Sequence, residues 1–253
     1  MCKIYRGMVI EIEGNDGSGK RTTAEIIASS LEAAGFDVEI VSFPQHGTIN
    51  GQLVDEFLYN GLNFSGDKMV KALREGSIYA VDRMVALTKV KENGKSYIDE
   101  LNEGKVLIMD RYVASNFIHR SRTMDEKELE EYINIMETIE YDVHRIPEPD
   151  FVFVLKVLPE VSRQNIKKRN RQEDENESLE NLKLSYEKLT KLIDLKGYTG
   201  IECCETDKDG NTVMRDKYDI AKDILLSIVM REKTVLKELQ NHIAEYENND
   251  ENK

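Results

Sequence analysis

The residues with the clearest chemistry are the glycines and the lysine of segment 14–22, which reads Gly-Asn-Asp-Gly-Ser-Gly-Lys-Arg-Thr. The spacing G-x-x-x-x-G-K is that of a P-loop, in which glycines let backbone N–H groups turn toward phosphate oxygens and the lysine reaches the β- and γ-phosphates. A helix that follows directly adds positive potential at its N-terminus. The segment therefore predicts a nucleotide-phosphate site made of Gly14, Asn15, Asp16, Gly17, Ser18, Gly19, Lys20, Arg21 and Thr22.

The position after the lysine departs from this pattern. P-loops carry Ser or Thr there, and the hydroxyl is an Mg²⁺ ligand, whereas this chain has Arg21, with Thr22 one place later. Because Mg²⁺ keeps several waters and needs few protein ligands, we expect the ion to rely on Asp16, Asp110 and the phosphate oxygens. The alternative is that Arg21 is an exposed helix residue without a role.

A second polar group follows the apolar run 105–109. Asp110 and Arg111 stand at the expected carboxyl end of a parallel strand, where ligands bind in open α/β sheets. Asp110 can serve a metal ion or its waters, and Arg111 can hold a phosphate through two parallel hydrogen bonds. A turn held by an Asp–Arg ion pair is the alternative interpretation.

The elements that must position these residues alternate along the whole chain. Strands are predicted at 8–13, 37–43, 105–109, 151–157 and, more weakly, 201–204. Helices are predicted at 21–34 and around 50–60, 67–91, 125–143, 178–195 and 215–240. Strands separated by helices of this length imply right-handed crossovers and a parallel sheet. We therefore predict an α/β fold with one P-loop domain (1–232), a five-stranded parallel sheet and helices on both faces. A polar helix and a disordered acidic tail are predicted for 233–253.

Composition restricts the partners. The chain of 253 residues has 35 basic and 48 acidic side chains, a net charge of −13, and this field opposes nucleic-acid polymers and anionic membranes. No apolar run approaches the roughly 18 residues of a membrane span. Three cysteines, two of them adjacent, make no disulfide framework. We expect a cytoplasmic protein with a small anionic ligand and with neither a nucleic-acid polymer nor a membrane as partner.

Five short motifs in order resemble the thymidylate kinase family. They are Gly14–Lys20, Ser42-Phe-Pro44, Tyr79-Ala-Val-Asp-Arg83, Asp110–His119 and Pro149-Asp150 ahead of a strand. Their order and spacing match from about residue 8 to about residue 230. The resemblance implies a homodimer that transfers the γ-phosphoryl group of ATP to dTMP, with Mg²⁺ as cofactor.

The resemblance also implies roles for single residues. Asp16 would lie near the acceptor's sugar and the metal ion, Tyr79 would stack on thymine, and Arg83 would hydrogen-bond the base. Arg111 would hold the phosphate under attack, and His119 would crowd the 2′ position of the sugar. The whole acceptor site would comprise Phe43, Pro44, Gln45, Tyr79, Arg83, Arg111, Ser115, Asn116, His119 and Arg120. Tyr79 and Arg83 are four apart on a predicted helix, which agrees with a ring and a donor fork meeting one base.

Two acceptor-site positions depart from the family. Gln45 stands where the family often has a phosphate-binding arginine, and Arg120 stands where many members have glutamine. Arg120 compensates for Gln45 only if it points into the cleft. These departures leave two alternatives open: a kinase of the same fold for another nucleoside monophosphate, and a non-catalytic nucleotide-binding regulator.

The cation that bridges the two substrates comes, in this family, from an arginine inside the P-loop or from a lid. Residues 15–18 contain no arginine, so we expect the cation from the lid, about residues 163–178, where basic residues cluster. Arg169 or Arg171 would then complete a catalytic set with Lys20, Asp16 and Arg111. The alternative is a solvated helix end paired with the acids that follow it.

Overall fold

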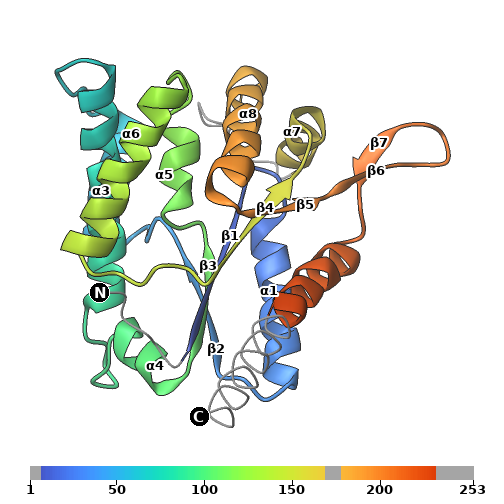
Figure 1. Ribbon diagram of the computed structural model, residues 1–253, viewed down its shortest axis with the longest axis horizontal. Helices are drawn as coiled ribbons and strands as arrows, with labels where there is room; N and C mark the ends of the chain where they lie inside the picture. Colours follow the sequence, from blue (N-terminus) through green and yellow to red (C-terminus); the bar gives the residue numbers. More distant parts are fainter. Residues whose placement is uncertain (1–6, 169–177, 232–253) are drawn as a thin grey trace, which may run out of the picture.

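A parallel sheet lies at the centre of the computed structural model, which describes residues 7–168 and 178–231 (Figure 1). Its strands are β1 (Met8–Gly14), β2 (Val38–Ser42), β3 (Val106–Asp110), β4 (Phe151–Lys156) and β5 (Thr199–Glu202). The spatial order is β2-β3-β1-β4-β5 and every pairing is parallel. The predicted five-stranded parallel sheet is therefore confirmed.

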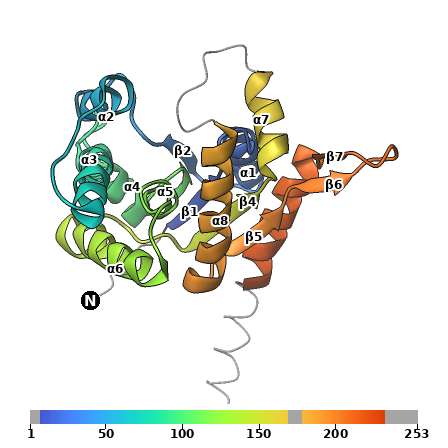
Figure 2. The same cartoon turned by 90° about the horizontal axis from the view of Figure 1, so that it is seen from above.

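Helices cover both faces of this sheet. They are α1 (Lys20–Ala33), α2 (Ile49–Asn60), α3 (Lys68–Thr88), α4 (Tyr97–Glu103), α5 (Ala114–His119), α6 (Glu126–Glu137), α7 (Pro159–Lys167) and α8 (Leu179–Lys196). A further helix is described over residues 217–231, and α6 continues as a π-helix, η1 (Thr138–Val143). Figures 1 and 2 show α3, α4 and α6 on one side of the sheet, with α1 and the helix 217–231 on the other.

Two cores result, because successive strand residues point to opposite faces. On one face Val9 of β1 packs in the core that includes residues of α3, α5, α6 and α8. On the other face Ile10 and Ile12 pack with Ile27 of α1 and Ile224 of the helix 217–231. Each of these side chains is almost fully buried, which stabilises the fold by about 1.5–3 kcal/mol per large apolar side chain.

The register of the central strands decides where the site forms. Ile12 of β1 pairs with Asp110 of β3, so the end of β3 lies beside the start of the P-loop. Ser42, the last residue of β2, pairs with Asp110 in the same way. The carboxyl ends of β1, β2 and β3 therefore bring the two polar groups of the sequence to one edge of the sheet.

Some elements differ from the predictions. The fifth strand ends at Glu202 rather than at residue 204, and Cys204 begins a two-stranded antiparallel hairpin, β6 (Cys204–Thr206) with β7 (Thr212–Met214). The helices α4, α5 and α7 were not predicted, since each spans fewer than ten residues and gives little periodic signal. The segment 233–253 lies outside the described residues.

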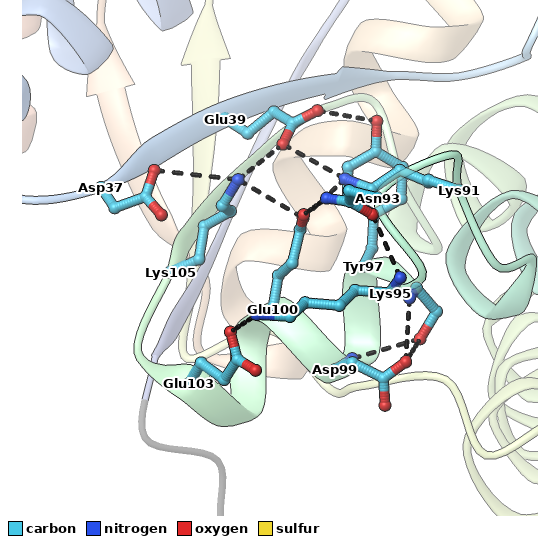
Figure 3. A network of polar contacts seen from close by, with 11 residues as sticks. Asp37, Glu39, Lys91, Asn93, Lys95, Tyr97, Asp99, Glu100, Glu103 and Lys105 are labelled. Carbon is cyan, nitrogen blue, oxygen red and sulfur yellow. Dashed lines mark hydrogen bonds and ion pairs between the residues drawn. The ribbon is translucent and has the colours of Figure 1, made fainter.

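A polar network closes the opposite end of the sheet, where β2 and β3 begin (Figure 3). Lys105 Nζ donates to Glu39 Oε2 at 2.9 Å and lies 3.4 Å from Glu100 Oε2. Lys91 pairs with Glu100 at 2.6 Å and lies over the ring of Tyr97, 3.9 Å from its centroid. Burial opposes the charge of Glu39, but Lys105 outweighs it and holds the pKa of Glu39 below its usual range. The network ties the loop between α3 and α4 to the sheet, away from the P-loop.

Within the described part of the chain, no helix combines the length and the apolarity that crossing a membrane requires.

Candidate active site

The P-loop connects β1 to α1, and its lysine points back into the loop. Lys20 is buried, and its Nζ donates to the carbonyl oxygens of Gly14 at 2.8 Å and Asn15 at 2.9 Å. Gly19 precedes the helix with φ 87°, and no side chain caps the helix N-terminus. The first N–H groups of α1 have no acceptor inside the helix, which is the usual arrangement for binding a phosphate.

α7 packs directly on this loop. Asn165 Nδ2 donates to the carbonyl oxygen of Gly17 at 3.0 Å. A Cβ atom on Gly17 would lie 2.4 Å from the carbonyl oxygen of Ser162, so only glycine fits at this close approach. The P-loop is thus held by α7, the helix in which the predicted lid begins.

The charge of Lys20 is affected by its surroundings. Burial, and then the nearby guanidinium of Arg111, lower the pKa of Lys20 from 10.5 to about 8. An anionic ligand would favour the charged form. Lys20 is therefore mostly charged at neutral pH, and a bound polyphosphate would raise its pKa again.

A cavity of about 200 Å³ opens beside the P-loop, between the ends of β2 and β3 and the helices α2, α3 and α5. Every predicted acceptor-site residue except Gln45 lines it. Gln45 turns away, because its Nε2 donates to the carbonyl oxygen of Ser42 at 2.8 Å. The cavity walls also include Asp16, His46, Leu58, Tyr59 and Tyr112.

Arg111 joins the P-loop to the cavity. Its side chain forms an ion pair with Asp16 of the loop, and its Nη1 lies 3.1 Å from His119 Nε2. Its backbone is left-handed, with φ 68°, a conformation that costs a non-glycine residue about 1 kcal/mol or more. Strain of this kind occurs where a fold holds a functional side chain in place.

His119 lies between two arginines. Arg122 Nη2 lies 2.9 Å from its Nδ1, opposite the contact with Arg111. Burial, followed by the charge of Arg111, holds the pKa of His119 well below its usual range. The imidazole is therefore neutral at physiological pH, and since a neutral ring has one acceptor nitrogen, it accepts from one arginine at a time.

Arg83 and Asn116 are oriented by one buried carboxylate. Glu140, on the π-helix, accepts from Arg83 Nε at 2.8 Å and also pairs with Nη2, and Arg83 Nη1 donates to Tyr112 O at 3.2 Å. Asn116 Nδ2 donates to Gly76 O at 3.2 Å and to Glu140 Oε1 at 3.4 Å. The amide NH₂ thus faces two acceptors, which leaves Asn116 Oδ1 as the acceptor available to a ligand.

An aromatic wall closes another side of the cavity. The ring of Tyr79 meets Phe57 edge to face at 6.1 Å, and the Arg120 guanidinium lies 5.6 Å from the Tyr79 ring centroid. Arg120 also pairs with Glu75 at 2.9 Å. Arg120 is also one of the residues that line the cavity, which is the placement it needs to replace the arginine missing at position 45.

The carboxylates predicted to serve a metal ion lie on either side of the P-loop lysine in sequence and near one another in the fold. Asp110 Oδ2 accepts from Ser42 Oγ at 3.4 Å, at the ends of β3 and β2. Asp16 lies in the loop and pairs with Arg111. Carboxylate and hydroxyl oxygens are the hard donors that Mg²⁺ prefers, so this donor set fits that ion.

Two parts of the prediction need separate mention. Arg169 and Arg171, the predicted lid arginines, lie outside the described residues. The description stops at Lys168 and resumes at Ser178. Conversely, the sequence analysis missed His46, Leu58, Tyr59 and Tyr112 in the cavity wall and Glu140 beneath it. For His46 and Tyr112 the signal was adjacency to the motifs Phe43-Pro44 and Asp110-Arg111; Leu58, Tyr59 and Glu140 carried none.

Together, the sheet order, the P-loop with its buried lysine and the adjoining arginine-lined cavity define a P-loop phosphotransferase with a small anionic acceptor. Comparison with known proteins is more specific: the family model of thymidylate kinase matches residues 12–204. The chain belongs to the thymidylate kinase family, and the resemblance seen in the sequence is confirmed.

Individual relatives agree with this assignment. A thymidylate kinase of Mycobacterium tuberculosis is 29% identical over 156 residues, which cover 61% of this chain and 68% of that protein. A probable thymidylate kinase of Methanosarcina barkeri is 29% identical over 173 residues, covering 66% of this chain and 73% of the relative. The solved structure of a thymidylate kinase from Candida albicans superposes with a TM-score of 0.64 at 18% identity, covers 91% of this chain and 94% of that one, and supports the fold.

Proposed function

We propose that this member of the thymidylate kinase family transfers the γ-phosphoryl group of ATP to dTMP, forming ADP and dTDP. The observation that carries the proposal is the Asp16–Arg111 ion pair, because it links the P-loop to the wall of the adjoining cavity. A donor phosphate on Lys20 and an acceptor phosphate on Arg111 would then be neighbours. Phosphoryl transfer needs little beyond such alignment and neutralisation of the developing charge.

The choice of base is supported by the polar groups that Glu140 orients. Thymine offers an N–H donor at N3 and a carbonyl acceptor at O4, whereas cytosine presents an amino donor at position 4. Asn116 Oδ1 as acceptor and the remaining N–H groups of Arg83 as donors match thymine or uracil and mismatch cytosine. Tyr79 would stack on the ring, and burial raises the pKa of its phenol further above the ordinary value.

Magnesium and the lid complete the proposed site. We assign Mg²⁺ to Asp16 and Asp110, with the nucleotide's own phosphate oxygens as further ligands. Bound there with ATP, Mg²⁺ neutralises charge on the phosphates. Arg169 and Arg171 are kept as the proposed source of the catalytic cation from the lid.

A homodimer is part of the proposal. Ile49 and Leu53 on α2 and Val81 on the neighbouring α3 are exposed, Ile49 to 88%. Exposed apolar surface of this kind is typical of protein–protein interfaces. Light scattering on the purified protein should give a dimer, and Leu53→Asp should shift it toward monomer.

A coupled assay of ADP release tests the reaction. ATP should be offered with a panel of ribo- and deoxynucleoside monophosphates, and dTMP should give the highest kcat/KM, followed by dUMP, with little turnover of dCMP. Lys20→Ala should abolish turnover, since Lys20 is the cation buried inside the loop itself, with its Nζ against the carbonyl oxygens of Gly14 and Asn15. Preference for a purine or cytidine monophosphate would replace the proposed acceptor. ATP binding without transfer to any acceptor would instead indicate a regulatory relative.

A further inference from the structure

Arg21 occupies the P-loop position at which other loops hold Mg²⁺ through a hydroxyl. Its side chain leaves the first turn of α1 and reaches the end of β2, where Nη1 donates to Ser42 Oγ at 2.9 Å. Ser42 Oγ in turn donates to Asp110 Oδ2 at 3.4 Å. The guanidinium therefore lies two hydrogen bonds from the carboxylate assigned to the metal ion.

Little holds Arg21 in its present place. Its other partner is Glu25, one turn along α1, with Nε 2.8 Å from Oε1. The side chains of Arg21 and Glu25 are 58% and 54% exposed. An exposed ion pair of this spacing contributes only about 0.3–0.5 kcal/mol, so a polyphosphate carrying several negative charges competes with it easily.

From this placement we propose that Arg21 turns from Glu25 onto the phosphates of ATP and supplies, at the metal position of the P-loop, part of the positive charge that Mg²⁺ supplies in other P-loops. The inference rests on the ATP binding proposed above. A guanidinium presents planar donors that match phosphate oxygens, and it stays charged throughout the physiological range. ATP binding should therefore depend less on Mg²⁺ here than in a P-loop with Ser or Thr at this position.

Calorimetric binding of ATP, with Mg²⁺ or with excess EDTA, tests the inference without any turnover. The wild-type protein should lose less than tenfold in affinity when Mg²⁺ is removed. Arg21→Thr should bind ATP normally with Mg²⁺ and lose at least tenfold more than the wild type in EDTA. Arg21→Lys, which keeps the charge but not the fork, should lie between them.

Two matched controls separate this role from a general effect of charge. Glu25→Gln frees Arg21 from its ion pair and should leave ATP binding in EDTA unchanged or tighter. Lys89→Thr removes an exposed positive charge after α3, far from the loop, and should change neither condition. Equal losses in EDTA for wild type and Arg21→Thr would overturn the inference while leaving the proposed function intact. Absence of ATP binding even with Mg²⁺ would overturn both.

Discussion

At the scale of single residues, the charge states of the site lead to measurable behaviour. Lys20 has a pKa of about 8 without nucleotide, so the free protein loses this charge as the pH rises through 8. ATP binds best to the charged form, and above pH 8 binding must therefore take up a proton. The apparent Kd for ATP should rise by up to tenfold per pH unit above pH 8.

Calorimetry at several pH values, in two buffers of different ionisation enthalpy, measures both the Kd and the proton uptake. Lys20→Arg is the control, because arginine stays charged and its Kd should not rise over this range. A wild-type Kd that is flat from pH 7 to above 9 would show that Lys20 keeps its charge in the free protein.

The side chain of His119 is expected to determine whether the site accepts a ribose or a deoxyribose. As a neutral ring held between Arg111 and Arg122, it has little freedom to move away from an added 2′-hydroxyl. We expect His119→Ala to raise kcat/KM for UMP relative to dUMP by about tenfold, since steric rejection by a fixed wall is lost. The ratio in the wild type should not change between pH 6 and 8, because the ring is neutral throughout. An unchanged UMP/dUMP ratio in the variant would remove His119 from sugar selection.

At the scale of elements, α5 depends on two buried carboxylates of β1. Its N-cap residue, Val113, provides no side-chain cap. Instead Glu13 accepts from Tyr112 N at 3.0 Å and from Ser115 Oγ, and Glu11 accepts from Ala114 N at 2.9 Å. Glu13 also accepts from Gly14 N at 3.3 Å, so the same side chain contacts the P-loop and the helix of the cavity wall.

Substitution by glutamine should change the free energy of unfolding in opposite directions at Glu11 and Glu13. Burial, and then the charge of Glu13, raise the pKa of Glu11 well above its usual value of 4.5. Folded Glu11 therefore stays protonated while unfolded Glu11 ionises, and stability falls as the pH rises above 4.5. Glu11→Gln mimics the protonated acid and should raise the free energy of unfolding at neutral pH.

Glu13→Gln should behave in the opposite way. It places an amide NH₂ against backbone donors and should cost about 1–3 kcal/mol of stability. The KM for dTMP should rise more than kcat falls, because the disturbed helix carries Ser115, Asn116 and His119. Chemical denaturation and steady-state kinetics on both variants measure these effects, and equal behaviour of the two would contradict the assignment of Glu13 as the cap of α5.

The same elements explain what the sequence could predict. The P-loop is contiguous, and alternating strands and helices imply a parallel sheet, so both followed from local patterns. The burial of the Glu11 and Glu13 side chains could not be predicted from such patterns, because their alternation with Ile10 and Ile12 is also typical of a half-exposed strand. Only the placement of β1 between β3 and β4, with α5 above it, makes these acids internal. The contribution of Leu58 and Tyr59 to the cavity likewise depends on how α2 packs on α3.

At the scale of the whole molecule, an acidic chain places a local group of cations at the edge of the sheet where two anionic substrates would bind. The net charge is −13, yet Arg111, Arg120 and Arg83 line one cavity beside Lys20. Their neighbours Asp16, Glu75 and Glu140 partly neutralise them in the free protein. The opposite edge of the sheet carries the network of Lys105. We therefore expect substrate binding to depend on residues at the carboxyl ends of the strands, and the Lys105 network at the other end to affect stability alone.

Lys105→Met tests that separation. The Lys105 side chain is 15% exposed and forms ion pairs with Glu39 and Glu100. Its loss should therefore reduce the free energy of unfolding by about 1–2 kcal/mol, with kcat/KM for dTMP unchanged.

The pKa values of Glu39 and Glu100 are lowered from 4.5, so this stabilisation is present above pH 4.5 and is lost as the pH falls through the lowered values. The difference between wild type and variant, measured by urea unfolding at pH 7 and below pH 4.5, should shrink accordingly. Lys95→Met is the matched control, because the Lys95–Glu103 pair is exposed on both sides and its removal should leave the free energy of unfolding almost unchanged. A loss of activity in Lys105→Met, at unchanged stability, would instead couple this end of the sheet to the site.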